Sequence, residues 1–180
     1  LIEKNKAEAL QAAIFHVLPD ATTQTAFRLG EAGGFQVLGE EDLGAQRIYA
    51  GYDDDERLVG LAVEAQGMGY QDVIRLIYGY SIAEEVIVGI QVLESKETPG
   101  LGDKIQTDPD FLKNFERLDV SLVADRSATA NPIVAVKHGE KTHAWEVDGI
   151  TGATISSKAI ADILDRSAQY WAPRIQSNLH

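Results

Sequence analysis

The sequence has 180 residues, a formal net charge of −12 and no cysteine. The negative charge argues against nucleic acids and anionic membrane surfaces as partners, since both attract clustered lysine and arginine. Without cysteine the chain itself holds no disulfide, thiolate metal site or iron–sulfur cluster. The length and the 44% of hydrophobic residues are typical of one globular domain.

The N-terminal part predicts one helix followed by a weakly patterned region. Apolar residues from Leu10 to Leu18 recur at helical spacing within a helix over residues 3–18, and Pro19 helps to end it. Residues 21–44 are rich in glycine, so we expect loops there with at most one short strand. No stretch approaches the roughly 20 apolar residues that a membrane-spanning helix requires.

The middle of the chain predicts antiparallel strands. Segments rich in β-branched and aromatic residues predict strands at residues 46–51, 58–66, 72–80 and 86–93. The acidic residues 53–56 lack the spacing of a calcium loop and are interpreted as a solvated hairpin turn. Residues 67–70 are predicted to join the next two strands as a glycine turn.

A loop and a short helix are predicted after these strands. The loop, residues 94–104, contains the pair Pro99-Gly100, which is typical of a turn. Asp108 and Pro109 then predict a helix start, as the N-cap and the first helical residue. The buried face of this helix is expected to consist of Phe111, Leu112, Phe115 and Leu118.

A hairpin of residues 132–136 and 142–147 is predicted to lead into a seven-residue turn and an amphipathic helix. The seven residues are Asp148, Gly149, Ile150, Thr151, Gly152, Ala153 and Thr154. The helix begins at Ile155, and its predicted apolar stripe consists of Ile155, Ala159, Ile160, Ile163 and Leu164. We expect regular structure to end at residues 170–173.

The turn before this helix has the features of a phosphate site. Free backbone N–H groups and the positive end of the helix dipole favour an anion there. Gly152 and Ala153 keep side-chain bulk away, and Thr151 and Thr154 add hydroxyls. The local pattern also fits a simple helix cap by Thr151 or Thr154, which is the commoner arrangement.

The seven residues resemble the flavinylation signature of the FMN-binding domain family, which includes the G subunit of the Rnf complex and the C subunit of the Na⁺-pumping NADH:quinone reductase. A second family element precedes it in the family's order, at Glu97-Thr98-Pro99-Gly100-Leu101-Gly102. In that family the last threonine of the signature carries FMN through a phosphoester bond that a flavin transferase installs. The resemblance therefore implies Thr154 as the acceptor.

The resemblance also implies which other residues contact FMN or are read by the transferase. Asp148, Thr151, Gly152 and Ala153 would surround the attachment point. The transferase would also read Asp148, Gly152, Ala153 and Thr154. The upstream loop would position the isoalloxazine ring, and its implied contact residues are Glu97, Thr98, Gly100, Leu101 and Gly102.

The fold implied is α+β, an antiparallel β-sheet packed by a few helices, in a single soluble domain over residues 1–180. Within it we expect an N-terminal helix and irregular region at 1–45, an FMN-binding core at 46–168 and a tail at 169–180. The relatives have one membrane helix before this domain, so an anchor is expected upstream of Leu1, with the domain on the extracytoplasmic, periplasmic side of the cell membrane.

The function implied is that of a covalent-FMN electron carrier in a membrane-bound, ion-translocating complex, and the upstream loop is more similar to the Rnf G subunit. The partners would be the other subunits and the flavin transferase. Two alternatives stay open: a flavin-free assembly subunit, and a reductase that binds FMN non-covalently.

No catalytic residue and no metal ligand is expected from this chain. The histidines have no metal-ligand spacing, and no Ser/His/Asp arrangement follows from their order: His16, His138, His143 and His180. Redox chemistry would belong to the cofactor, and the chain would work as a redox subunit rather than turn over alone.

Overall fold

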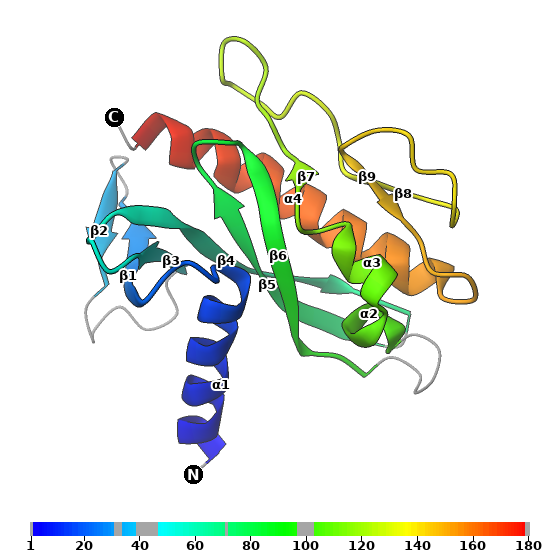
Figure 1. Cartoon of the computed structure of the whole chain (residues 1–180), viewed down its shortest axis with the longest axis horizontal. Coiled ribbons are helices and arrows are strands. Elements are labelled where there is room, and N and C mark those ends of the chain that lie inside the picture. Colours follow the sequence, from blue (N-terminus) through cyan, green and yellow to red (C-terminus); the bar gives the residue numbers. More distant parts are fainter. Residues whose placement is uncertain (1, 31–33, 39–46, 71, 97–102, 179–180) are drawn as a thin grey trace.

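A seven-stranded antiparallel sheet forms the centre of the computed structural model (Figure 1), which describes residues 2–30, 34–38, 47–70, 72–96 and 103–178. The strand order is β2-β1-β3-β4-β5-β6-β7. The strands are β1 (Thr23–Leu29), β2 (Phe35–Val37), β3 (Arg47–Tyr52), β4 (Leu58–Met68), β5 (Val73–Ser81), β6 (Val86–Glu94) and β7 (Leu118–Asp119).

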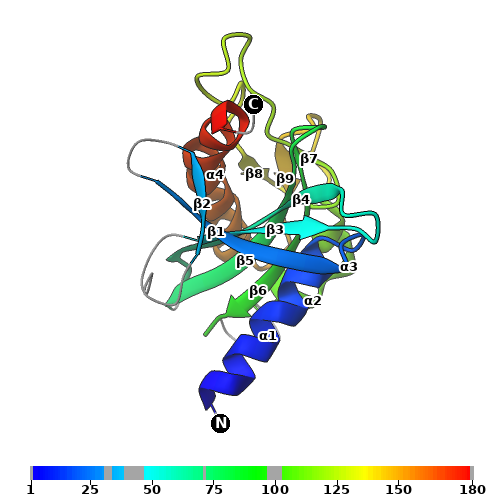
Figure 2. The same ribbon diagram turned by 90° about the vertical axis from the view of Figure 1, so that its left-hand side faces the viewer.

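Helices cover both faces of this sheet, α1 (Ile2–Val17) on one and α4 (Thr154–Asn178) on the other (Figures 1 and 2). Successive side chains of a strand point to opposite faces. Accordingly, Ile77 of β5 belongs to the group of buried residues on the α1 side of the sheet. Its neighbours Leu76 and Tyr78 belong to the group on the α4 side. The Tyr78 hydroxyl shares a hydrogen bond of 2.7 Å with Ser167 of α4, and burial raises its pKa.

The remaining elements lie beside the N-terminal half of α4. They are α2 (Lys104–Thr107), α3 (Pro109–Lys113), β8 (Val134–Val136) and β9 (Glu146–Asp148). Strands β8 and β9 form a separate two-stranded sheet, and Figure 1 shows it next to α4. This part of the fold brings α3, β9 and the start of α4 together. No helix in the described ranges is both long and apolar enough to cross a membrane.

The end of α1 approaches the sheet closely because glycines face it. Gly79 of β5 is paired with Gly89 of β6. A Cβ atom at Gly79 would overlap the Val17 carbonyl, whereas a Cβ at Gly89 would lie 3.4 Å from the Val17 Cα, an ordinary contact. The backbone of α1 therefore lies closer to Gly79 than to Gly89.

We expect Gly79→Ala to lower the free energy of unfolding by about 1–3 kcal/mol, since the added methyl group must displace the backbone of α1. Gly89→Ala is the matched control, because its added methyl group has room, and we expect a change below about 0.5 kcal/mol. Urea unfolding followed by circular dichroism measures both. Equal losses in the two variants would contradict the close approach at Gly79.

Most of the predicted elements are confirmed, and so is the α+β class. The helix over residues 3–18 is α1, and the four predicted strands are β3, β4, β5 and β6. The acidic residues 53–56 form the turn between β3 and β4. Asp108 caps α3, with its carboxylate accepting a hydrogen bond of 3.0 Å from the Phe111 N–H.

Two predictions about short elements were wrong. Residues 21–44 contain two strands, β1 and β2, because β1 pairs with β3 from Thr23 to Arg28 and with β2 at its end, despite its poor apolar pattern. The expected hairpin is absent, since β8 and β9 pair in parallel. The chain turns twice between them: the Glu140 N–H bonds to the Lys137 carbonyl, and the Glu146 N–H bonds to the His143 carbonyl.

Two predictions about α4 were also wrong. The helix continues to Asn178 and contains Pro173, so regular structure does not end at 170–173. Burial of Trp171 and Ile175 against the core outweighs the hydrogen bond that proline removes. Ile155 is 56% exposed, and the buried stripe begins with Ser156 and Ser157.

Candidate functional site

The seven residues predicted to form a turn connect β9 to α4 directly. β9 ends at Asp148 and α4 begins at Thr154. The Gly149 N–H donates to the Val136 carbonyl of β8, 2.9 Å away, and the Ala153 N–H donates to the Ile150 carbonyl at 3.0 Å. These bonds fold residues 148–154, here called the 148–154 turn, against the start of the helix.

Ser157 closes the 148–154 turn from inside. Its buried hydroxyl donates to the Ala153 carbonyl at 2.8 Å and accepts from the Ile150 N–H at 3.1 Å. Ile150 and Ala153 are buried with it, whereas Thr151 and Thr154 are exposed. The turn therefore has an inner half that holds the fold and an outer half that faces solvent.

Neither threonine of the turn acts as a helix cap. Among the described residues, no hydrogen-bond partner is found for the hydroxyl of Thr151 or of Thr154, and Thr154 is itself the first residue of α4. The simple capping interpretation is thus not supported. Both hydroxyls are available to a ligand.

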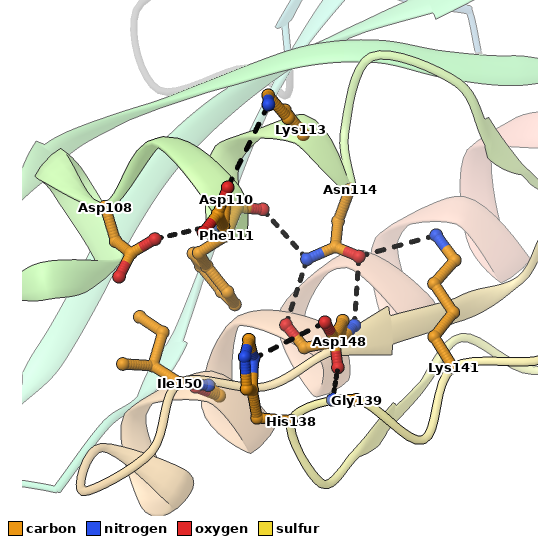
Figure 3. Close-up of polar contacts among 11 residues, drawn as sticks. Asp108, Asp110, Phe111, Lys113, Asn114, His138, Gly139, Lys141, Asp148 and Ile150 are labelled. Carbon is orange, nitrogen blue, oxygen red and sulfur yellow. Dashed lines mark hydrogen bonds and ion pairs between the residues drawn. The ribbon is translucent and has the colours of Figure 1, made fainter.

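The carboxylate of Asp148 contacts His138 and Gly139 of its own chain (Figure 3). One oxygen accepts a hydrogen bond of 2.7 Å from the Gly139 N–H, and the other lies 3.5 Å from Nδ1 of His138. Its side chain is 26% exposed. The backbone of Asp148 is held as well, since the side chain of Asn114 bonds both its N–H and its carbonyl. Asp148 thereby fixes the 138–139 loop beside the turn.

The far end of the same loop is fixed by Glu146. Its carboxylate accepts hydrogen bonds from the Thr142 N–H and the His143 N–H, each 2.8 Å long, and one from the Thr142 hydroxyl. The two backbone hydrogen bonds contribute most to holding the pKa of Glu146 below its ordinary value. The loop between β8 and β9 is therefore anchored at both ends.

Two cavities meet at the 148–154 turn, and they share His138, Gly149, Ile150 and Thr151. The larger has a volume of about 530 Å³, within the size range of cofactor sites. Its walls include Thr151, Gly152, Thr154, Lys137 and Lys158. The smaller, about 240 Å³, is lined by Asp148 and by residues of α2 and α3, among them Lys104, Asp108 and Phe111.

The larger cavity fits a ligand with an anionic group and an apolar part. Lys137 and Lys158 bring two positive charges to the cavity and Glu140 one negative charge, in a chain whose net charge is −12. Thr154 and Lys158 are one helical turn apart on the first turns of α4, where the helix dipole also favours an anion. Ala135, Val136 and Ile150 supply apolar surface. The residues present are thus compatible with FMN, which combines a phosphate with a flat ring.

The structure brings part of the predicted site together. Thr151, Gly152 and Thr154 line the larger cavity, and Asp148 lines the smaller one. Ala153 is buried beneath them. The second predicted element, with Glu97, Thr98, Gly100, Leu101 and Gly102, lies outside the described residues. Within the described ranges, no group of three or more His, Asp or Glu side chains is placed to hold a metal ion.

Several residues of the site were missed from the sequence. Ser157 and Lys158 follow the motif closely, and their spacing of three and four residues from Thr154 was the available signal. His138 was interpreted only as part of the turn between the two predicted strands, and Lys137, just after the first of them, was given no role. Asn114 gave no signal, because its partner Asp148 is 34 residues away.

A model of the FMN-binding domain family matches residues 69–169. Curated proteins described as the G subunit of an ion-translocating oxidoreductase complex are similar over most of the chain. The one from Methanosarcina acetivorans is 39% identical over 168 residues, covering 92% of this chain and 76% of that protein. The one from Escherichia coli K12 is 28% identical over 167 residues, covering 92% and 75%.

Two solved structures have the same fold as this chain. NqrC of Shewanella oneidensis superposes with a TM-score of 0.73 at 17% identity, covering 96% of this chain and 98% of that one. The C subunit of the Na⁺-translocating NADH-quinone reductase of Parabacteroides distasonis gives 0.67 at 19% identity, covering 98% and 84%. At these identities the likeness shows the fold.

Proposed function

Since the chain belongs to the FMN-binding domain family, with the G subunits of ion-translocating oxidoreductase complexes among its relatives, we propose that it is the covalent-FMN electron carrier of such a complex, of the Rnf type. The observation that carries this proposal is the geometry of Thr154. Thr154 is exposed, is the first residue of a long helix and lines a cavity of about 530 Å³ that is also lined by Lys137 and Lys158.

In this proposal the Thr154 oxygen carries FMN as a phosphoester. Joining a hydroxyl to a phosphate requires an activated phosphate, such as the phosphoanhydride of FAD. The Thr154 oxygen attacks the phosphorus on the flavin side, a new P–O bond forms, the anhydride P–O bond breaks, AMP leaves, and the threonine proton passes to a base. In this proposal a separate flavin transferase, which the resemblance to the family implies, supplies that base.

The ester product retains one negative charge on the phosphate. The N–H groups at the start of α4 and the side chains of Lys137 and Lys158 would stabilise this charge. When bound, FMN supplies the redox chemistry. The chain's own residues would hold and orient it, so we propose a redox subunit that depends on the other subunits of the complex for turnover.

The remaining parts of the proposal rest on the resemblance to the family. They are a single domain over residues 1–180, a membrane anchor before it, and a location on the extracytoplasmic, periplasmic side of the inner membrane. Glu97, Thr98, Gly100, Leu101 and Gly102 would contact the ring.

The test is the intact mass of the denatured chain after co-expression with an active flavin transferase, followed by peptide mapping. We expect an added FMN group on the peptide that contains Thr154. Flavin that is released on denaturation would instead support a non-covalent reductase. An unmodified chain that never binds flavin, with the transferase active on a control substrate, would support a role in assembly alone.

A further inference from the structure

Asn114 is a buried polar residue that connects α3 to the 148–154 turn. It follows the last residue of α3 and is 6% exposed. We propose that Asn114 is a positioning residue for FMN attachment at Thr154, acting through the backbone of Asp148. This inference rests on the proposed function, and no part of Asn114 is expected to contact the flavin.

All polar atoms of the Asn114 amide have partners (Figure 3). Its Nδ2 donates to the Phe111 carbonyl at 2.9 Å and to the Asp148 carbonyl at 3.0 Å. Its Oδ1 accepts from the Asp148 N–H at 2.9 Å and from Nζ of Lys141 at 3.4 Å. One side chain therefore holds both backbone polar groups of Asp148, which fixes the orientation of that residue.

The orientation of Asp148 matters because the turn begins there. The next two residues are also fixed, since the Gly149 N–H bonds to Val136 and the Ile150 N–H bonds to Ser157. These anchors lie in β8 and α4, whereas Asn114 supplies an anchor to α3. Without Asn114 the start of the turn would lose its hydrogen bonds to the α3 side of the site.

The same connection sets the shape of the smaller cavity. α3 and its N-cap contribute Asp108, Asp110 and Phe111 to one wall, and Thr151 of the turn belongs to another wall. Asn114 joins the two walls through Asp148. A change in their separation moves the outer half of the turn, and misplacement of a reacting group by about 1 Å can cost up to 10²-fold in rate.

The variants Asn114→Ala and Asn114→Asp separate positioning from stability. Alanine removes all four hydrogen bonds, whereas aspartate keeps an acceptor for the Asp148 N–H and loses the donor to the Asp148 carbonyl. Gln176→Ala is the matched control. Gln176 is 4% exposed and bonds to Tyr80, Ile82 and Arg126, but it lies about 33 Å along α4 from Thr154, at 1.5 Å per residue.

The measurement uses the full chain as substrate of a flavin transferase with FAD, and determines kcat and KM for attachment. It is made at a temperature where near-UV circular dichroism shows each chain folded. We expect kcat to fall about tenfold or more for both Asn114 variants with KM little changed, and Gln176→Ala to match the unsubstituted chain.

Each other outcome overturns the inference. Folded Asn114 variants that react at the unsubstituted rate would exclude positioning, and an equal loss of kcat in Gln176→Ala would assign the effect to stability. Failure of both Asn114 variants to fold where Gln176→Ala folds would leave Asn114 a purely structural role. If the unsubstituted chain itself takes no flavin, the proposed function fails, and this result differs from all the others.

Discussion

Thr154→Ala is expected to abolish covalent attachment of FMN and to leave the free energy of unfolding within about 0.5 kcal/mol of its original value. The loss is complete because no other atom at position 154 can form the phosphoester. The fold is unaffected because the Thr154 side chain is exposed and no described residue bonds to its hydroxyl. Alanine is also the most favourable residue within a helix.

Two further variants test which hydroxyl is the acceptor. Thr154→Ser retains a hydroxyl at the same position, so we expect attachment to continue, at a rate that reflects how the transferase accepts serine. Thr151→Ala removes the other exposed hydroxyl of the turn, and we expect flavin to remain covalently bound. In-gel flavin fluorescence after denaturation and peptide mass mapping measure all three. Covalent flavin in Thr154→Ala, or its loss only in Thr151→Ala, would contradict the assignment.

The parts of the fold that the sequence predicts well are those with a local cause. The four strands β3 to β6 contain β-branched or aromatic residues and have hairpin partners adjacent in the chain. The cap of α3 depends on Asp108 and Pro109 alone. Such elements are specified within a few residues, so a pattern in the sequence is enough to find them.

The missed parts depend on partners far away in the sequence. β1 is a strand because β3 lies beside it, about twenty residues later. The last turns of α4 persist beyond Pro173 because Trp171 and Ile175 are buried in the core, and the bonds of Gln176 to Tyr80 and Ile82 add to this. In each case tertiary contacts decide a segment whose local pattern is weak or unfavourable.

The residues of the candidate site fall into the same two groups, those specified locally and those held by partners far away in the sequence. Thr154 and its neighbours follow one another in the chain, so the motif could be identified from the sequence. The supports of the turn come from elsewhere: Asn114 from α3, Val136 from β8 and Gly139 from the loop between β8 and β9. Asp148 in particular belongs to the signature, and the structure shows its carboxylate bonded within its own protein. This geometry explains its place in the motif without contact to a transferase.

Gly152→Val is expected to have the second-largest effect on flavin attachment. Gly152 has a φ of +82°, in the left-handed region where a side chain costs about 1–2 kcal/mol and a β-branched one more. A Cβ atom there would meet no other atom within 4 Å, so the cost comes from the backbone and not from a clash within the chain. We expect the free energy of unfolding to fall by about 1–3 kcal/mol.

Attachment should slow by about tenfold or more in Gly152→Val, because relief of the strain changes φ at position 152 and moves Thr154 with it. Gly152→Asn is the matched control, since asparagine is close to valine in bulk and tolerates positive φ far better. We expect it to retain both most of the stability and most of the rate. Urea unfolding and the transferase assay measure the two quantities.

The comparison between valine and asparagine distinguishes two reasons for glycine at this position. If the left-handed backbone is the reason, the rate of attachment follows the loss of stability across the two variants. If instead the flavin or the transferase needs the open space above Gly152, Gly152→Asn will be as slow as Gly152→Val while remaining nearly as stable as the unsubstituted chain. The positive φ of Gly152 leads us to expect the first result. A stable but unreactive Gly152→Asn would show that the space itself is required.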